Sequence, residues 1–249
     1  MLADLLLFVA IGFAAQIVDG AIGMAYGLVS TTVLLSFGVP VTTASASVHA
    51  AEVFTTGASA LSHWRLGNVD RRLFVRLAPA GMLGGALGAF VLVAVPGEIM
   101  RPVVSLYLAV MGGVILWKAL RHSAGQDGEP RHVATLGLFG GFVDAVGGGG
   151  WGPLVASTLV GRGTTARLAI GSTNAAEFLV TVTISGTFVV TLGLELWPVI
   201  AGLILGGVIA APLAAYATRT IPDRPLMILV GVVIVLLSLR EMARLFGGP

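Results

Sequence analysis

Long apolar runs, separated by short charged or proline-containing stretches, make up almost the whole chain. A helix needs about 20 apolar residues to cross the hydrocarbon core of a bilayer, and most of the runs reach this length. None of them alternates at every second residue, as the strands of a membrane β-barrel do. The pattern predicts an all-α, polytopic membrane bundle with runs at roughly 2–37, 41–63, 73–95, 102–120, 133–160, 165–192, 197–218 and 225–243.

Composition agrees with this prediction. Apolar residues make up 56% of the 249 residues and charged residues only 10%, whereas a soluble domain carries about 25% charged residues. The mean hydropathy is +0.98. These values exclude a soluble globular domain, a disordered protein and a nucleic-acid-binding protein. The chain has no cysteine, which excludes disulfides, a thiol nucleophile and a cysteine metal site.

The N-terminal run is expected to belong to the mature protein. A signal peptide begins with a basic segment, but this chain begins Met-Leu-Ala-Asp. The apolar stretch also continues past Asp19 into a second one. We therefore expect the run to be part of the membrane bundle.

The two halves of the chain repeat each other. The segment QIVDGAIGMAYG (16–27) matches GFVDAVGGGGWG (141–152), and SASVHAAEVFTT (45–56) matches AIGSTNAAEFLV (169–180). Aspartate, glutamate and glycine recur at one spacing of 125 residues (144 − 19, 177 − 52 and 152 − 27). Duplicated halves are typical of transporters. We expect a first repeat over 1–120, a cytoplasmic linker over 121–132 and a second repeat over 133–249.

The distribution of basic residues favours inverted repeats. Lys and Arg gather on the cytoplasmic side of membrane proteins. If the first run of each half is a hairpin, eleven of the 14 basic residues lie inside; if it crosses once, nine do. A single helix over the 36 residues of the first run would also be about 54 Å long, which exceeds the thickness of a bilayer. Each half is therefore predicted to contain a broken hairpin and three crossings, with a periplasmic N-terminus.

Four acidic residues lie inside apolar runs, and the duplication pairs them. They are Asp19 with Asp144, and Glu52 with Glu177. A carboxylate in hydrocarbon is costly unless it faces a cavity or a partner. Each aspartate precedes a glycine-rich segment and can cap a broken helix. Each glutamate can take part in proton exchange or gating, because burial disfavours its charged form. A purely structural role remains the alternative for all four.

Glycine clusters follow both aspartates. A glycine run is unfavourable inside a helix, and an irregular turn at membrane depth occurs where it lines a cavity. The helix after such a turn presents free N–H groups and a positive dipole end, which suits an anion. The alternative is close helix packing through small residues. The candidate substrate-binding glycines are Gly20, Gly23 and Gly27 in the first half, and Gly147, Gly148, Gly149, Gly150 and Gly152 in the second.

Three further residues are candidates for the same site. His49 lies three residues before Glu52 on one helix face, and Asn174 replaces it in the second half. We expect His49 and Asn174 to lie near the anion and Trp151 to act as a gate or an anchor. Because no other histidine lies deep inside a run, His63 being at the very end of its run, we expect no metal and no cofactor.

The motifs GGGGWGP (147–153) and HWRLGNVD (63–70) resemble those of the TauE/SafE family of sulfite exporters, also called the toluene sulfonate uptake permease family. The resemblance covers essentially the whole chain. It implies a multi-pass protein of the bacterial inner membrane that moves a small sulfur-containing anion.

The sequence and this resemblance together predict a secondary transporter of a sulfur oxyanion or organosulfur anion. Sulfite export, driven by protons or by the membrane potential, is the leading hypothesis. A channel-like anion pore and a transporter of another carboxylate or sulfonate are the alternatives. An enzyme is not expected. A homodimer is one of the oligomeric states left open. The anion site is predicted near the bilayer midplane, between the two glycine-rich breaks.

Overall fold

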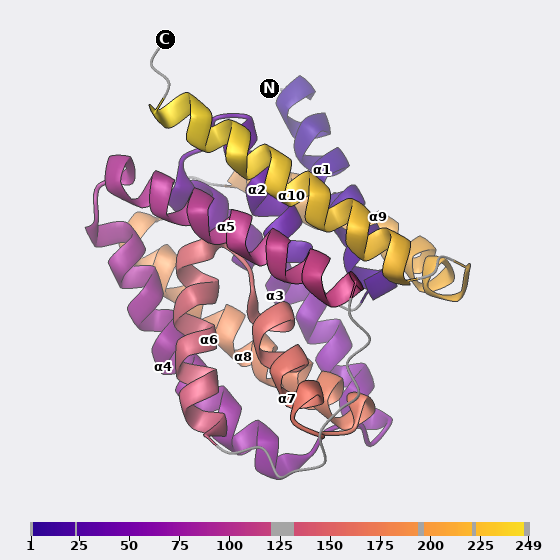
Figure 1. Cartoon of the computed structure of the whole chain (residues 1–249). Helices are drawn as coiled ribbons and strands as arrows, with labels where there is room; N and C mark the ends of the chain where they lie inside the picture. Colours follow the sequence, from indigo (N-terminus) through magenta and orange to yellow (C-terminus); the bar gives the residue numbers. More distant parts are fainter. Residues whose placement is uncertain (1, 23, 121–131, 194–196, 221–222, 247–249) are drawn as a thin grey trace.

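The computed structural model describes residues 2–22, 24–120, 132–193, 197–220 and 223–246. Gly23 and residues 121–131 of the predicted linker lie outside these ranges. In the described ranges the chain is all-helical, with ten α-helices and one π-helical turn, η1 (Figure 1). The elements are α1 (Leu2–Ile22), α2 (Tyr26–Ser36), α3 (Val41–Arg65), α4 (Arg71–Ala94), α5 (Gly97–Leu120), α6 (Val133–Gly147), η1 (Gly152–Ala156), α7 (Ser157–Gly161), α8 (Ala166–Leu192), α9 (Trp197–Thr220) and α10 (Asp223–Phe246).

The all-α prediction is confirmed, and the helices follow the apolar runs closely. The largest difference is at α5, which begins at Gly97 and not at residue 102. Its first turn contains Glu98 and is followed by Arg101 and Pro102. Pro102 is the sixth residue of α5, and its missing N–H leaves the Glu98 carbonyl oxygen without its usual intrahelical partner, but the helix continues through it. Charge and proline therefore did not mark a helix boundary at this point.

The repeats interlock by exchanging helices. Helix α1 packs along α9, and its counterpart α6 packs along α4. Glycine permits this close approach on both sides. A Cβ at Gly12 would lie 2.8 Å from Leu203 Cα, and one at Gly137 would lie 2.8 Å from the Leu77 carbonyl oxygen. Each repeat therefore buries its first helix against the other repeat.

Counterpart helices also pair directly, and they run in opposite directions. Along α3 and α8, Thr56 lies beside Thr181 while the later residue Gly57 lies beside the earlier Phe178. Along α5 and α10, Figure 1 shows the two ribbons side by side with opposite chain directions. Thr56 and Thr181 are themselves 125 residues apart in the sequence (181 − 56), and their hydroxyl oxygens are 3.4 Å apart. Two residues that the sequence repeat pairs therefore lie side by side where counterpart helices meet.

The outer surface of the bundle is apolar. Four of the described helical segments are long and apolar enough to cross a membrane: Arg71–Ala94, Gly97–Leu120, Arg167–Leu192 and Arg224–Leu245. Large apolar side chains of α4, α5 and α10 are exposed, among them Leu83, Phe90, Leu106, Val110, Leu229 and Leu236. Contiguous apolar surface of this kind marks contact with lipid. The chain is thus built as a multi-pass membrane protein.

An ion pair connects α5 with α10, and a hydrogen bond from a charged side chain connects α10 with α2. Arg101 of α5 forms an ion pair with the buried carboxylate of Glu241 on α10. At the same end of α10, Arg244 donates a hydrogen bond of 3.3 Å to the carbonyl oxygen of Ser36 at the end of α2. The N-terminal end of α5 and the C-terminal ends of α2 and α10 therefore lie on one side of the bundle.

Candidate functional site

The second glycine cluster forms an irregular break in the backbone. Helix α6 ends at Gly147, and the next three glycines have φ angles of 68°, 146° and 137°. These angles favour glycine because it lacks a Cβ. The chain resumes its helical course at Trp151, and η1 begins at the next residue, Gly152. The predicted non-helical turn over residues 148–150 is therefore present.

The first break repeats this geometry with different residues. Gly20 lies in the last turn of α1, and α2 begins at Tyr26 after Ala25, whose φ angle is 103°. Ala25 corresponds to Gly150 at the spacing of 125 residues. The backbone thus adopts a left-handed conformation at this position in both repeats.

Each predicted aspartate caps the helix that follows its break. Asp19 Oδ1 accepts a hydrogen bond of 3.1 Å from the backbone N–H of Tyr26. Asp144 Oδ1 accepts one of 2.9 Å from the backbone N–H of Trp151. Both bonds span seven residues. The aspartates therefore occupy backbone donors that were expected to be open to an anion.

The two breaks touch each other at the centre of the bundle. A Cβ at Gly27 would lie 2.6 Å from Gly149 Cα and 2.9 Å from a carboxylate oxygen of Glu52. Thr31 donates a hydrogen bond of 2.5 Å to the Gly148 carbonyl oxygen. From α5, Tyr107 donates one of 2.7 Å to the Gly149 carbonyl oxygen. The two breaks, between which the sequence predicts the anion site, are thus in direct backbone contact.

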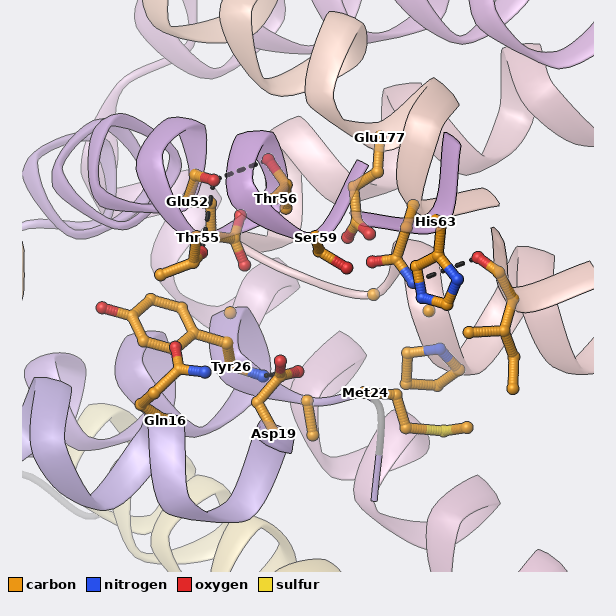
Figure 2. Close-up of a pocket in the computed structure, with 17 residues that line it drawn as sticks. Gln16, Asp19, Met24, Tyr26, Glu52, Thr55, Thr56, Ser59, His63 and Glu177 are labelled. Atoms are coloured by element: carbon orange, nitrogen blue, oxygen red, sulfur yellow. Dashed lines mark hydrogen bonds between the residues drawn. The ribbon is translucent and has the colours of Figure 1, made fainter. Parts of the chain in front are cut away.

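A cavity of about 270 Å³ opens beside this contact. Figure 2 shows Glu52 of α3 and Glu177 of α8 reaching into it from one side and Asp19 of α1 from the other. None of the described residues that line it is Lys or Arg. The lining consists of Gln16, Asp19, Met24, Ala25, Tyr26, Gly27, Glu52, Thr55, Thr56, Ser59, His63, Gly150, Gly152, Pro153, Ile170, Asn174 and Glu177.

Of the fifteen predicted site residues, Gly20 lies in the last turn of α1 and Gly23 lies outside the described residues, and the other thirteen fall into two groups. Seven of them line the cavity: Asp19, Gly27, Glu52, Gly150, Gly152, Asn174 and Glu177. Six are packed behind it or in the break: His49, Asp144, Gly147, Gly148, Gly149 and Trp151. Residues of both repeats therefore line the cavity, and the first repeat contributes more of them than the second.

His49 is placed differently from the expectation that it lies near the anion. Its ring is fully buried, and Nε2 lies 3.3 Å from Asp144 Oδ2. Its Nδ1 lies 2.8 Å from the Ser45 carbonyl oxygen. Both ring nitrogens thus have partners inside the protein. The sequence pattern placed His49 on the face of Glu52, but could not show that a residue of the other repeat lies against it.

The family of the chain follows from a comparison of its sequence with known families. Residues 8–241 match the family described as "Sulfite exporter TauE/SafE". The chain belongs to the TauE/SafE family. The family and the apolar helices together show that this TauE/SafE protein is a multi-pass membrane transporter.

A bacterial relative supports the same assignment. The TauE/SafE protein is 40% identical over 248 residues to a protein of Bacillus subtilis (strain 168) named "Probable membrane transporter protein YtnM". The match covers 96% of this chain and 82% of that relative. No solved structure matches the chain.

Sequence reasoning missed a polar stripe on α3 of the TauE/SafE protein. Thr55, Thr56, Ser59 and His63 follow Glu52 at helical spacing and line the cavity. Residues three and four apart share one face of a helix, so continuing that face from Glu52 could have found them. Tyr26 was missed as well, although the duplication aligns it with Trp151.

Lys118 supports the second broken element. It lies in the last turn of α5, where its Nζ donates a hydrogen bond of 2.5 Å to the Pro153 carbonyl oxygen and another to the Ser157 hydroxyl. A π-helical turn leaves backbone carbonyl groups in need of partners. Lys118, near the end of the predicted run 102–120, thus stabilises η1.

In the described part of the chain, no cluster of three His, Asp or Glu side chains could hold a metal ion.

Proposed function

We propose that this protein is a secondary transporter that exports a small sulfur oxyanion, most directly sulfite, across the bacterial inner membrane together with protons. The observation that carries the proposal is the shared cavity of Asp19, Glu52 and Glu177, which lies where the two broken helices meet. The family's printed description supports the choice of sulfite.

The chemistry of the cavity explains the need for protons. An anion that enters it meets three carboxyl groups and no Lys or Arg among the described lining residues. Two like charges about 4 Å apart repel by about 4 kcal/mol at an effective dielectric constant of 20. Anion binding is therefore favourable only when carboxyl groups take up protons. Protons then move in the same direction as the anion.

Neutral donors supply the direct contacts with the anion. The first N–H after each break is already bonded to an aspartate. Side chains in the lining supply further donors, above all the amide of Asn174 and the hydroxyl group of Ser59. Protonated Glu52 and Glu177 add two O–H donors. Hydroxyl and amide donors of this kind bind the oxygen atoms of a small oxyanion without a permanent positive charge.

We infer that the two repeats have opposite orientations in the membrane. Counterpart helices that pair across a pseudo-two-fold axis run antiparallel when that axis lies in the membrane plane. The directions of α3 against α8 and of α5 against α10 support this arrangement. It agrees with the distribution of arginine and lysine along the chain.

The membrane potential favours outward movement. An inside-negative potential assists the exit of an anion by about 2.3 kcal/mol per charge per 100 mV. Sulfite is divalent, so the complex with one proton still leaves as a monovalent anion. Potential and proton uptake can therefore act in the same transport cycle.

The test is transport by purified protein in proteoliposomes. Sulfite, thiosulfate, sulfate, an alkyl sulfonate and lactate are offered in turn, with and without a pH gradient. We expect saturable sulfite transport that responds to the gradient. Saturation separates the transporter from a channel-like pore, and the panel separates sulfite from a carboxylate or sulfonate substrate. Transport of lactate alone, or flux that is linear in concentration, would contradict the proposal.

A further inference from the structure

The cavity is asymmetric with respect to the two repeats. It reaches from the breaks toward Ser59 and His63, at the end of α3 that leads into residues 66–70. The start of α8 lies at the same end, because Asp70 N donates a hydrogen bond of 2.8 Å to Ser172 Oγ. The cavity thus extends toward one side of the bundle.

Each lining residue has a counterpart in the other repeat, whose residue number is higher or lower by the repeat spacing of 125. Asp19 corresponds to Asp144, and Asn174 corresponds to His49. Ser59 corresponds to Ile184, and His63 corresponds to Phe188. We call His49, Asp144, Ile184 and Phe188 the closed counterpart, because their exposed fractions are only 0%, 1%, 0% and 2%.

The closed counterpart is packed tightly. His49 Nε2 lies 3.3 Å from Asp144 Oδ2, and the His49 ring lies 6.5 Å from the Phe188 ring, centre to centre. A Cβ at Gly85 of α4 would lie 2.7 Å from Ile184. Leu83-Gly84-Gly85 matches Leu205-Gly206-Gly207 at a slightly different spacing of 122 residues (207 − 85). At Gly207, the nearest atom to a Cβ would be 3.7 Å away. The packing at this position is therefore tighter in one repeat than in the other.

We propose that the closed counterpart is the second half of the transport pathway, and that it opens toward the opposite side of the membrane when the repeats exchange conformations. The proposal rests on the proposed function. Inverted repeats offer two related packings of similar energy, one open to each side. Release of the His49–Asp144 pair and separation of Phe188 from His49 would open a cavity that matches the one described.

Residue differences between the repeats decide which side is open. On the closed side His49 faces Asp144, so an ion pair can form there. On the open side Asn174 stands where the histidine would be, and it donates its amide hydrogen bond, 3.0 Å long, to its own helix at Ile170. Asp19 therefore has no histidine partner from α8. The His49–Asp144 pair stabilises closure on its side only.

Cysteine accessibility tests the proposal directly. The chain has no cysteine, so each introduced cysteine is unique. Ser59→Cys reports on the open cavity, and Ile184→Cys reports on the closed counterpart. The exposed positions Arg72, in the first turn of α4, and Glu98, in the first turn of α5 just beyond the other end of α4, mark the two sides of the membrane when changed to cysteine. An impermeant maleimide is applied to sealed vesicles of known orientation, without any substrate.

We expect Ser59→Cys to be labelled from the same side as Arg72→Cys. Ile184→Cys should be labelled more slowly, from the side of Glu98→Cys. Labelling of Ile184→Cys from the Arg72 side would overturn the proposal. So would a complete absence of labelling in protein that transports its substrate. Labelling needs no substrate, so a wrong choice of sulfite leaves this result unaffected.

A residue exchange between the repeats provides the second measurement. His49→Asn removes the pair with Asp144 and should raise the labelling rate of Ile184→Cys about tenfold, since a hydrogen bond to a charged group shifts a two-state equilibrium by this order. Asn174→His offers Asp19 a partner and should slow the labelling of Ser59→Cys. Ser62→Ala, on the exposed part of α3, is the matched control. Unchanged labelling in both exchange variants would contradict the assignment of His49.

Discussion

At the scale of single residues, the structure shows Asp19 and Asp144 as hydrogen-bond acceptors that stabilise the backbone. Each accepts the first N–H of the helix beyond its break. Asp144 also faces His49, so it joins three segments of the chain. Its loss therefore leaves a buried backbone donor and a buried imidazole without their partner.

Asp144→Ala should be strongly destabilising, by about 3–5 kcal/mol, the range seen when one partner of a buried pair is removed. Asp144→Asn should cost less because the amide oxygen still accepts the Trp151 N–H. Thermal unfolding of the purified protein in detergent measures the difference. Equal melting temperatures of the alanine variant and the wild-type protein would show that the cap is dispensable.

Gly150 is a second residue whose role depends on its surroundings. It has a φ angle of 137°, and a Cβ there would collide with the Tyr107 hydroxyl oxygen. Gly150→Ala should therefore abolish transport by moving the break, with little effect on insertion. Gly113→Ala on α5 is the control, since nothing lies within 4 Å of its Cβ position. Transport is measured as sulfite flux at matched expression; equal flux in the two variants would contradict this role.

The duplication in the sequence made Asp19, Asp144 and Gly150 predictable as site residues. Two acids and a glycine at one spacing pointed to both breaks and to Glu52 and Glu177. The surroundings of His49 could not be predicted in the same way, because Asp144 lies 95 residues further along the chain. A contact between repeats leaves no local pattern in the sequence. The same holds for Tyr107, which reaches the second break from α5.

At the scale of helices, the contact between α5 and α10 depends on charge as well as on apolar packing. The Glu241 side chain is buried, and Arg101 is its partner. Desolvation of both groups offsets much of their attraction, so the pair adds little net stability compared with an apolar pair. Replacing only one of the two residues nevertheless destabilises the protein, because the other charge stays buried without its partner.

Arg101→Met should destabilise the protein by about 3–5 kcal/mol, because it leaves the Glu241 carboxylate buried without its partner. The double variant Arg101→Met with Glu241→Leu should recover most of that loss. A double-mutant cycle on thermal stability in detergent measures the coupling. Additive losses in the double variant would show that the two residues do not act as a pair.

Helix positions were largely predictable because most of the apolar runs had the length of a membrane helix. The start of α5 was wrong by five residues, since charged residues and a proline there lie within the helix. The partners of each helix were not predictable. Small residues favour close packing in general, but they do not specify that α1 pairs with α9 and α6 with α4.

At the scale of the whole molecule, the interlocked repeats place their two breaks in contact. A displacement of the backbone at one break therefore displaces the other, because Gly27 and Gly149 are in contact. Thr56 and Thr181 lie side by side, and Glu52 and Glu177 lie one turn before them on their helices. The carboxyl groups that we propose for proton transfer thus lie close to the place where the two repeats meet.

The most direct test of this account is to record proton movement during sulfite flux in proteoliposomes that contain a trapped pH indicator. We expect sulfite entry into the vesicles to acidify their interior in the wild-type protein and in the control Glu98→Gln. In Glu52→Gln and Glu177→Gln, exchange of labelled for unlabelled sulfite should continue, while the associated proton movement is lost or strongly reduced. Undiminished proton movement with sulfite in a double Glu52→Gln, Glu177→Gln variant would contradict the central claim that these carboxyl groups carry the protons.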